Sequence, residues 1–505
     1  MSTKESKSKN CNRYISPSKG TVRRSLAFSF VDRYLSIIMQ FGASIIIARL
    51  LTPEEIGVYS VGAVIVGLAH VLRDFGVTNY LIQEKDLTAT KIRAAFTATL
   101  IIAWGVAGLL FLSGPWLAEY YEEPGMQQVV SVLAVNFLLI PFGSPVLALL
   151  RRNLRFDRLL WINVGSAFAH SATSVSLAVL GIGFMSLAWG GLAGVVATTV
   201  LATLNRPKGM PLLPSVRGIR KVLQFGGTAS AATLLSEAGL SAADLVVGKM
   251  LGFASVGYYS RGWGLVSLFN YAIGAAVSPV MHSSLAETHR SGRALAEEYL
   301  RALTYITPLA WTFYGFAGFM AYPLLHLLYG SQWDVAAPIV QVLCLAFALR
   351  ALTFFSGQAF LARGDVRNML LMQVILQPLR IGMTVLAATV SIVAVAWVQV
   401  IFYAATLAVT HWLLHSKIEL SWRKFIHGLI PSGIISAVAL IPTVLVVVAM
   451  GETDAGLGGL GISVVATGAT FVLALRFAGH PLGRELRAVG HRVFMPLSRY
   501  LFTRS

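Results

Sequence analysis

The chain has 505 residues, of which 56% are hydrophobic and only 12% charged; its mean hydropathy is +0.70 and its net charge at pH 7 is +18. Soluble globular domains carry about 25% charged residues, so this composition excludes that class of protein. The basic excess does not indicate nucleic-acid binding, because the sequence contains no folded basic domain to carry it.

Long apolar segments follow one another along the whole chain. Each approaches the roughly 20 residues that a helix needs to cross a bilayer, and their apolar runs are continuous, which favours helices over the alternating strands of a barrel. The predicted fold class is therefore an all-α polytopic membrane protein. We expect about fourteen spans, at residues 26–48, 56–82, 94–113, 127–150, 159–181, 184–204, 222–248, 254–281, 302–328, 336–361, 369–390, 393–415, 426–450 and 457–477.

The junction between the first two segments recurs 200 residues later. RLLTPEEIGVYSVGAVIVGL begins at Arg49, KMLGFASVGYYSRGWGLVSL begins at Lys249, and seven of the twenty aligned positions are identical. Such self-similarity indicates an internal repeat. Because six segments, an even number, separate the two copies, both halves run in the same direction through the membrane. Parallel repeats of this kind are typical of alternating-access transporters.

The repeat also predicts how the chain is divided. Its parts, in chain order, are a cytoplasmic basic tail (1–25), an N-terminal six-helix half (26–204), a cytoplasmic linker (205–221), a C-terminal six-helix half (222–415), two additional helices (426–477) and a second cytoplasmic basic tail (478–505).

The charged residues predict the orientation of the spans. With the N-terminus in the cytoplasm, 33 of the 40 Lys and Arg residues fall on the inner side and five within helices, which leaves only Arg49 and Lys249 outside. The outer loops carry acidic residues instead. This asymmetry follows the positive-inside rule and places both termini in the cytoplasm.

Several kinds of site are not expected. Cys11 lies in the first tail and Cys344 within a predicted helix, so we expect neither a disulfide nor a metal site. No GxxxxGK[ST] motif occurs in the sequence, so the chain is not expected to hydrolyse ATP. The sequence predicts no cofactor.

Three runs of sequence resemble a known family. ARLLTPEEIGVYSVGAVIVGLAHVLRDFGVTNYLIQ (48–83), LYGSQWDVAAPIVQVLCLAF (328–347) and FLARGDVRNMLLMQ (360–373) are similar to Wzx-type polysaccharide flippases, of the multidrug/oligosaccharidyl-lipid/polysaccharide superfamily. The resemblance implies two six-helix bundles that form a V around a central cavity, with the last two helices as additions. It also implies the activity, which is translocation of undecaprenyl-pyrophosphate-linked oligosaccharide from the inner to the outer leaflet, without catalysis. The membrane that the resemblance implies is the bacterial cytoplasmic (inner) membrane, with both termini of the chain in the cytoplasm.

Nine Asp, Glu or Arg side chains lie deep in the predicted helices. Each costs about 2.5–3.5 kcal/mol on insertion scales, so each is a candidate for function. Five are arginines, whose guanidinium groups suit a pyrophosphate. Arg350 and Arg380 rank first because neither has a nearby acid on its own helix; Arg33, Arg73 and Arg261 are the other candidates. In the resembled architecture the first, second, seventh and eighth helices line the cavity, and we expect these cations to face it.

The four acids have a different expected role. Glu237 lies close to the middle of the seventh predicted helix, with no cation at matching depth on the eighth, and is the candidate for proton binding in ion-coupled transport. Asp244, Asp32 and Asp74 are further ion-coupling candidates. Asp244 and Arg261 flank one short turn near the outer surface, where they can also form a structural pair.

A purely structural role for the inner charges stays open. If the helix at 56–82 is continuous, Arg73 lies about nine residues above its inner end, at a depth similar to that of Arg33 in the first helix. Asp32 and Arg33 can then pair crosswise with Arg73 and Asp74. Pairs of this kind hold helices together without binding substrate.

The expected substrate is a polyprenyl-pyrophosphate-linked oligosaccharide held among membrane lipids. A polysaccharide polymerase and glycosyltransferases of the same pathway are candidate partners. Two other functions within the superfamily stay open, a lipid II flippase and a drug/cation antiporter; five intramembrane arginines against four acids favour anionic cargo. A membrane enzyme acting on polyprenyl-linked sugars is the alternative from another class, but the outer loops offer little room for its active site.

Overall fold

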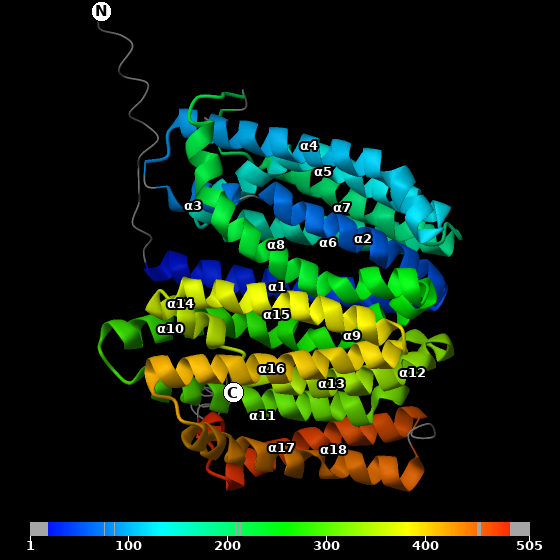
Figure 1. Ribbon diagram of the computed structural model, residues 1–505, viewed down its shortest axis with the longest axis vertical. Coiled ribbons are helices and arrows are strands. Elements are labelled where there is room, and N and C mark those ends of the chain that lie inside the picture. The colour runs from blue at the N-terminus through cyan, green and yellow to red at the C-terminus, as the bar shows by residue number, and fades with distance from the viewer. Residues whose placement is uncertain are drawn as a thin grey trace, which may run out of the picture. The chain divides into compact units, whose positions relative to one another are not determined.

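The computed structural model of the protein describes residues 19–74, 76–84, 86–207, 210–211, 214–451 and 456–484. Most of the two predicted basic tails, including Cys11, lies outside these residues. Within them the secondary structure is helical, with no strand (Figure 1). The chain forms two compact units, Met1–Gly257 and Tyr258–Ser505.

The first unit contains eight complete helices and the start of a ninth. Their bounds are α1 (Lys19–Leu50), α2 (Pro53–Asp74), α3 (Val77–Gln83), α4 (Ala89–Tyr121), α5 (Pro124–Arg152), α6 (Phe156–Val179), α7 (Met185–Leu204), α8 (Ile219–Met250) and α9 (Phe253–Phe269), the last crossing into the second unit. Helix α8, the first of the predicted C-terminal half, packs here against α2, α3 and α4.

The second unit continues from α9 and ends with the hairpin of α17 and α18, drawn in orange and red in Figure 1. Its elements are the π-helix η2 (Asn270–Gly274), α10 (Ala275–Arg290), α11 (Leu295–Phe319), α12 (Ala321–Tyr329), the 3₁₀-helix η3 (Ser331–Ala336), α13 (Ala337–Ala351), α14 (Ser356–Arg363), α15 (Val366–Ala388), α16 (Ile392–Ile418), α17 (Trp422–Met450) and α18 (Gly456–Phe477).

Each of the fourteen predicted segments coincides with one of these helices or with a broken pair of them. Within the described residues, ten helices are long and apolar enough to cross a membrane, and eleven if Phe253–Gly274 and Val277–Arg290, bent by 49°, form one span. The all-helical, multi-pass class is thereby confirmed. The count of fourteen spans stays a prediction.

The second predicted span is interrupted, which corrects the expectation of a continuous helix at 56–82. Helix α2 ends at Asp74, and α3 begins at Val77 with Gly76, at φ +67°, as its N-cap. Glycine adopts this left-handed conformation without the steric penalty that a side chain imposes. Arg73 therefore lies in the last turn of α2 rather than well inside a span.

The start of α2 explains the TPEE motif of the repeat. The backbone N–H of Thr52 donates to Glu55 Oε2 at 2.8 Å, and the backbone N–H of Glu55 donates to Thr52 Oγ1 at 3.2 Å. This reciprocal capping box satisfies backbone groups that a helix start leaves without partners. Its acidic side chains also lie where the helix dipole favours negative charge.

The repeated glycines mark a very close approach of two helix backbones in the first unit. A Cβ added to Gly57 would lie 1.8 Å from the carbonyl oxygen of Phe253, and one added to Gly257 would lie 2.0 Å from that of Pro53. The first turns of α2 and α9 therefore cross with their backbones in contact, and the two copies of the repeat contribute to this crossing reciprocally. Only glycine fits at either position.

A second glycine of the repeat makes equivalent contacts in each unit. A Cβ at Gly62 would lie 2.6 Å from Val129 of α5, and one at Gly262 would lie 3.2 Å from Val340 of α13. Each repeat copy thus packs its second glycine against a valine of a later helix in the same unit, α5 in the first and α13 in the second. The sequence repeat is matched by a repeated packing arrangement.

Candidate functional site

A cavity of about 490 Å³ opens in the first unit, between the end of α2, helix α3, and helices α5 and α7. Its volume is within the range of small-molecule sites. The apolar part of its lining comes from Ile140, Leu147 and Val195. Its polar lining consists of Arg73, Asp74, Thr78, Ser144, Arg151, Thr198 and Thr199.

Close helix packing positions these polar residues. A Cβ on Gly143 would lie 3.5 Å from the Cα of Thr199, so α5 and α7 approach closely beside the cavity. Thr198 Oγ1 lies 2.9 Å from the carbonyl oxygen of Gly194 and 2.7 Å from Ser166 Oγ of α6, which fixes its rotamer. Small residues permit this close packing, and hydroxyl groups that form hydrogen bonds between helices stabilise it in a membrane.

Arg73 is the more buried of the two arginines in the cavity. Its side chain is 12% exposed and its Nη2 lies 2.7 Å from Asp74 Oδ1, whereas the Asp74 side chain is 60% exposed. The Nε of Arg73 is buried without a hydrogen-bond partner. The guanidinium therefore retains donor capacity that its ion pair does not use.

Arg151 lies in the last turn of α5 and is exposed. Asp32 is within its electrostatic reach, but Arg151 forms no ion pair within the described part of the chain. The adjacent Arg152 has a different role, since its Nη1 donates to the carbonyl oxygens of Leu81 and Ile82, both at 3.0 Å, and so caps the end of α3. Of the two neighbours, Arg151 is the one that lines the cavity.

Asp32 pairs with a different partner from the one expected. Its Oδ2 accepts a hydrogen bond of 2.7 Å from Asn163 Nδ2 of α6, while Arg73 pairs with Asp74. The predicted pairing of Asp32 with Arg73 is therefore wrong. The physical reason is that α2 ends at Asp74, which lets Arg73 reach its own neighbour, whereas Asp32 faces α6. Arg33 follows Asp32 on α1 and is half-buried.

Arg380 and Arg350 lie in the second unit, and neither is part of the lining of the two cavities described here. Arg380 is 1% exposed; its Nη2 donates to Gln399 Oε1 of α16, and its guanidinium carbon lies 4.6 Å from the ring centre of Phe402. Arg350 lies 5.2 Å from the ring centre of Phe347 and 5.8 Å from that of Tyr403. A role for both in substrate binding stays a prediction.

The remaining predicted residues divide between the units. Arg261 of α9 lies 6.0 Å from the ring centre of Tyr329 and 5.9 Å from that of Trp333. Glu237 and Asp244 are half-buried on α8 and do not line the cavity. Because Asp244 belongs to the first unit and Arg261 to the second, their pairing stays a prediction.

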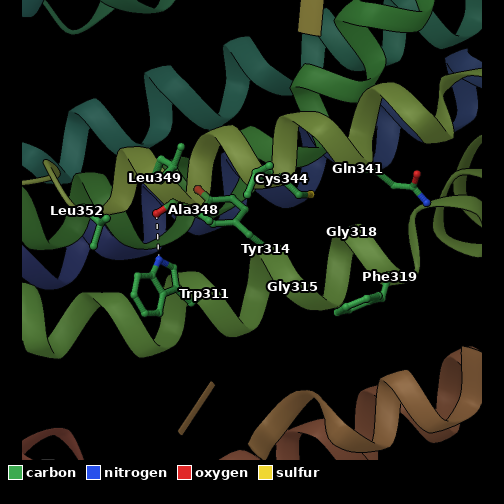
Figure 2. Close-up of a pocket in the computed structure, with 11 residues that line it drawn as sticks. Trp311, Tyr314, Gly315, Gly318, Phe319, Gln341, Cys344, Ala348, Leu349 and Leu352 are labelled. Carbon is green, nitrogen blue, oxygen red and sulfur yellow. Dashed lines mark hydrogen bonds between the residues drawn. The ribbon is translucent and has the colours of Figure 1, made fainter. Parts of the chain in front are cut away.

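An apolar pocket of about 650 Å³ lies in the second unit between α11 and α13. Figure 2 shows Trp311, Tyr314 and Phe319 along α11 and Leu349 and Leu352 on the facing helix, with Trp311 Nε1 donating to the carbonyl oxygen of Ala348 at 3.0 Å. The lining has no charged residue. Such a surface accepts hydrocarbon rather than an ionic head group.

The sequence did not reveal Arg151, Ser144 and Thr198 as site residues. Arg151 begins the basic run RRNLRFDR, which the positive-inside rule already explains as an inner loop. Hydroxyl residues in apolar helices are too common to single out. A search for residues that terminate helices on one side of the membrane would have brought Arg73 and Arg151 together.

Comparisons with known proteins agree with the motifs. A family model described as polysaccharide biosynthesis protein matches residues 46–338. The chain is similar to the lipopolysaccharide biosynthesis protein WzxC of Escherichia coli K12, with 22% identity over 64% of this chain and 66% of that protein, just under two thirds of its length. It is also similar to the teichuronic acid biosynthesis protein TuaB of Bacillus subtilis 168 (23%, covering 73% and 77%) and to the succinoglycan biosynthesis transport protein ExoT of Rhizobium meliloti 1021 (25%, covering 65% and 66%).

Solved structures show the same fold at low identity. The lipid II flippase MurJ in an inward closed conformation matches with a TM-score of 0.73 and 12% identity, over 89% of this chain and 99% of that one. An inward-facing multidrug resistance transporter of the MATE family matches with a TM-score of 0.60 and 14% identity, over 79% and 95%. Since the family model covers more than half of the chain, the protein belongs to the polysaccharide biosynthesis protein family, and its resemblance to Wzx-type members is confirmed.

Proposed function

We propose that the protein is a flippase that moves undecaprenyl-pyrophosphate-linked oligosaccharide repeat units across the bacterial cytoplasmic membrane by alternating access, for export of a surface polysaccharide. Family membership and a MurJ-like fold support a transporter of this kind. The observation that carries the proposal is the cavity lined by Arg73 and Arg151, because paired guanidinium groups with neighbouring hydroxyls suit a pyrophosphate joined to a sugar.

The proposed topology has fourteen spans in two parallel six-helix halves, 26–204 and 222–415, with both termini in the cytoplasm. The equivalent packing of Gly62 on Val129 and of Gly262 on Val340 supports the repeat. In this orientation α2 and α5 both end on the inner side, so the arginine-lined cavity is open to substrate made in the cytoplasm. The apolar pocket of the second unit offers a surface compatible with a polyprenyl chain.

Coupling is proposed through Glu237, with a proton or sodium gradient or the pull of polymerisation outside as the driving force. Glu237 is half-buried on α8, and its carboxylate makes no ion pair with a described residue. Glu237→Gln should then stop gradient-dependent flipping, whereas Glu237→Asp should retain part of it. Flipping that is indifferent to both gradients would remove ion coupling altogether.

The experiment that tests the function is a flipping assay in reconstituted vesicles with a fluorescent polyprenyl-pyrophosphate-linked oligosaccharide. Arg73→Gln and Arg151→Gln should each reduce the initial rate strongly. Arg155→Gln is the matched control, since Arg155 is a neighbouring inner arginine paired with Asp157 at 2.9 Å outside the cavity lining. If wild-type protein moves no such lipid, the function is refuted; if Arg155→Gln matches the other two, the cavity is not the binding site.

A lipid II flippase is the second candidate, favoured by the TM-score of 0.73 to MurJ. Competition between the two lipid-linked substrates in the same vesicles separates the alternatives. A drug/cation antiporter is disfavoured by the arginine-lined cavity, and uptake of a lipophilic cation driven by a proton gradient would support it instead. Release of free pyrophosphate or transfer of sugar during the assay would indicate an enzyme.

A further inference from the structure

The ion pair of Arg73 with Asp74 is unusual because it joins adjacent residues. Side chains one position apart do not face each other on a helix. The pair forms here at the end of α2, where Asp74 is the last helical residue and Gly76, at φ +67°, precedes α3. The 2.7 Å contact between Arg73 Nη2 and Asp74 Oδ1 is therefore a feature of the position where α2 ends.

The two partners differ strongly in burial. Asp74 is 60% exposed and Arg73 only 12%, so the carboxylate covers the guanidinium from its open side. The carboxylate engages Nη2 and leaves the buried Nε without a partner. A phosphate group bound in the bidentate geometry typical of arginine would engage two nitrogens and is thus the better ligand.

We infer that Asp74 is an internal competitor for the substrate, which occupies Arg73 in the empty cavity and is displaced by the pyrophosphate of the lipid-linked oligosaccharide. The inference rests on the proposed function and identifies a residue that sets the affinity of the cavity for its substrate. Arg73 is never left without a counter-charge in the exchange, because one anion replaces another. Arg151, which forms no ion pair with a described residue, supplies the second cation for a ligand that carries several negative charges.

Such a competitor has two consequences for transport. It weakens binding of every anion by a similar factor, so abundant weak ligands such as the phosphodiesters of membrane lipids do not fill the cavity. It also returns to Arg73 when the substrate departs, which prevents tight trapping. Removing the carboxylate should therefore lower KM and kcat together, a combination that a residue required only for folding would not produce.

The test measures binding of inorganic pyrophosphate to the purified full-length protein by calorimetry. Asp74→Asn and Asp74→Ser should each tighten binding, by up to roughly fivefold, because an ion pair with an exposed partner is worth up to about 1 kcal/mol. Asp74→Glu keeps a carboxylate and should bind as wild type does. The matched control is Asp157→Asn, which removes a comparable short-range pair with Arg155 at the inner side of the same unit and should change nothing.

A second arm uses the lipid-linked substrate in vesicles, so that effects on a free pyrophosphate are separated from effects on the lipid head group. There Asp74→Asn should lower both KM and kcat. Wild-type or weaker pyrophosphate binding by both neutral variants would overturn the inference, as would an unchanged KM. Failure of the proposed function looks different, since pyrophosphate binding would then be absent or insensitive to both Arg73→Gln and Arg151→Gln.

Discussion

Replacing Gly57 by alanine tests the helix crossing that the repeat builds. The added methyl group would lie 1.8 Å from the carbonyl oxygen of Phe253, where an ordinary contact begins at 3.4 Å. Because the obstacle is backbone rather than a flexible side chain, α2 and α9 must separate by about 1.6 Å at this point. Forcing extra atoms into a packed interface typically costs about 1–3 kcal/mol.

The expected result is a lower unfolding temperature in detergent, measured with a thiol-independent probe such as intrinsic tryptophan fluorescence. A loss near 2 kcal/mol corresponds to a fall of about 4–8 °C for a unit of some 250 residues. Gly67→Ala is the matched control, because Gly67 lies on the same helix with no atom within 4 Å of an added Cβ. Alanine favours helix by about 1 kcal/mol over glycine, so the control should be neutral or slightly stabilising.

The reciprocal geometry also predicts how the effects of the two glycine substitutions combine in a double variant. Gly257→Ala would place its methyl 2.0 Å from the carbonyl oxygen of Pro53, so one separation of the helices relieves both contacts. Gly57→Ala with Gly257→Ala should therefore cost less than the sum of the single changes. Strict additivity, or a Gly57→Ala protein that unfolds like Gly67→Ala, would refute the reasoning.

Three further predictions concern charged groups. Arg380→Met should leave the unfolding temperature nearly unchanged, because the substitution removes the desolvation cost of a buried charge that has no acidic partner. The rate of flipping should fall. A large loss of stability together with a normal flipping rate per folded molecule would contradict this prediction. The hydrogen bond from Lys249 Nζ (2.8 Å) lowers the pKa of the exposed Glu122 carboxyl. The pair therefore stabilises the fold above about pH 4.5, and this stabilisation is lost as the pH falls through the lowered pKa. Glu122→Gln should accordingly lower the unfolding temperature slightly at neutral pH and not in acid, and an equal difference at both would contradict it. Burial is the main cause, and the nearby Arg484 the second, of a lowered pKa of His480, whose Nε2 lies 3.3 Å from Ser432 Oγ. Because the folded state then binds a proton less readily than the unfolded state, the fold should lose stability as the pH falls below about 6.5. His480→Gln should reduce that loss.

Lys249 illustrates what the sequence predicts and what only the structure shows. The positive-inside count left it as an exception on the outer side. The structure pairs it with Glu122, one of the acidic residues that the count had placed on the same side. The sequence therefore predicted that these opposite charges lie on the same side of the membrane, and the folded chain brings the two residues, 127 positions apart, into contact.

The site was predictable in kind but not in composition. Intramembrane arginines were expected from the sequence, and Arg73 does line a cavity. Its cavity partner Arg151 comes from the end of α5, and the end of α2 before Gly76 places Arg73 in a last helical turn, beside the cavity. A single glycine among 46 in the chain gives no local signal that it will end one helix and begin another.

The sequence by itself determined the helical, multi-pass class, the positions of the apolar segments, the glycine-marked repeat and the family. These follow from length and hydropathy, since a chain in hydrocarbon must satisfy its backbone hydrogen bonds within each segment. Only the tertiary structure decided which polar partner each intramembrane charge finds, for example Asn163 for Asp32 and Gln399 for Arg380. The physical reason is that these helices are apolar on nearly every face, so no periodic pattern shows which face turns toward a neighbour; that choice is made by the packing of small residues and a few polar contacts between helices.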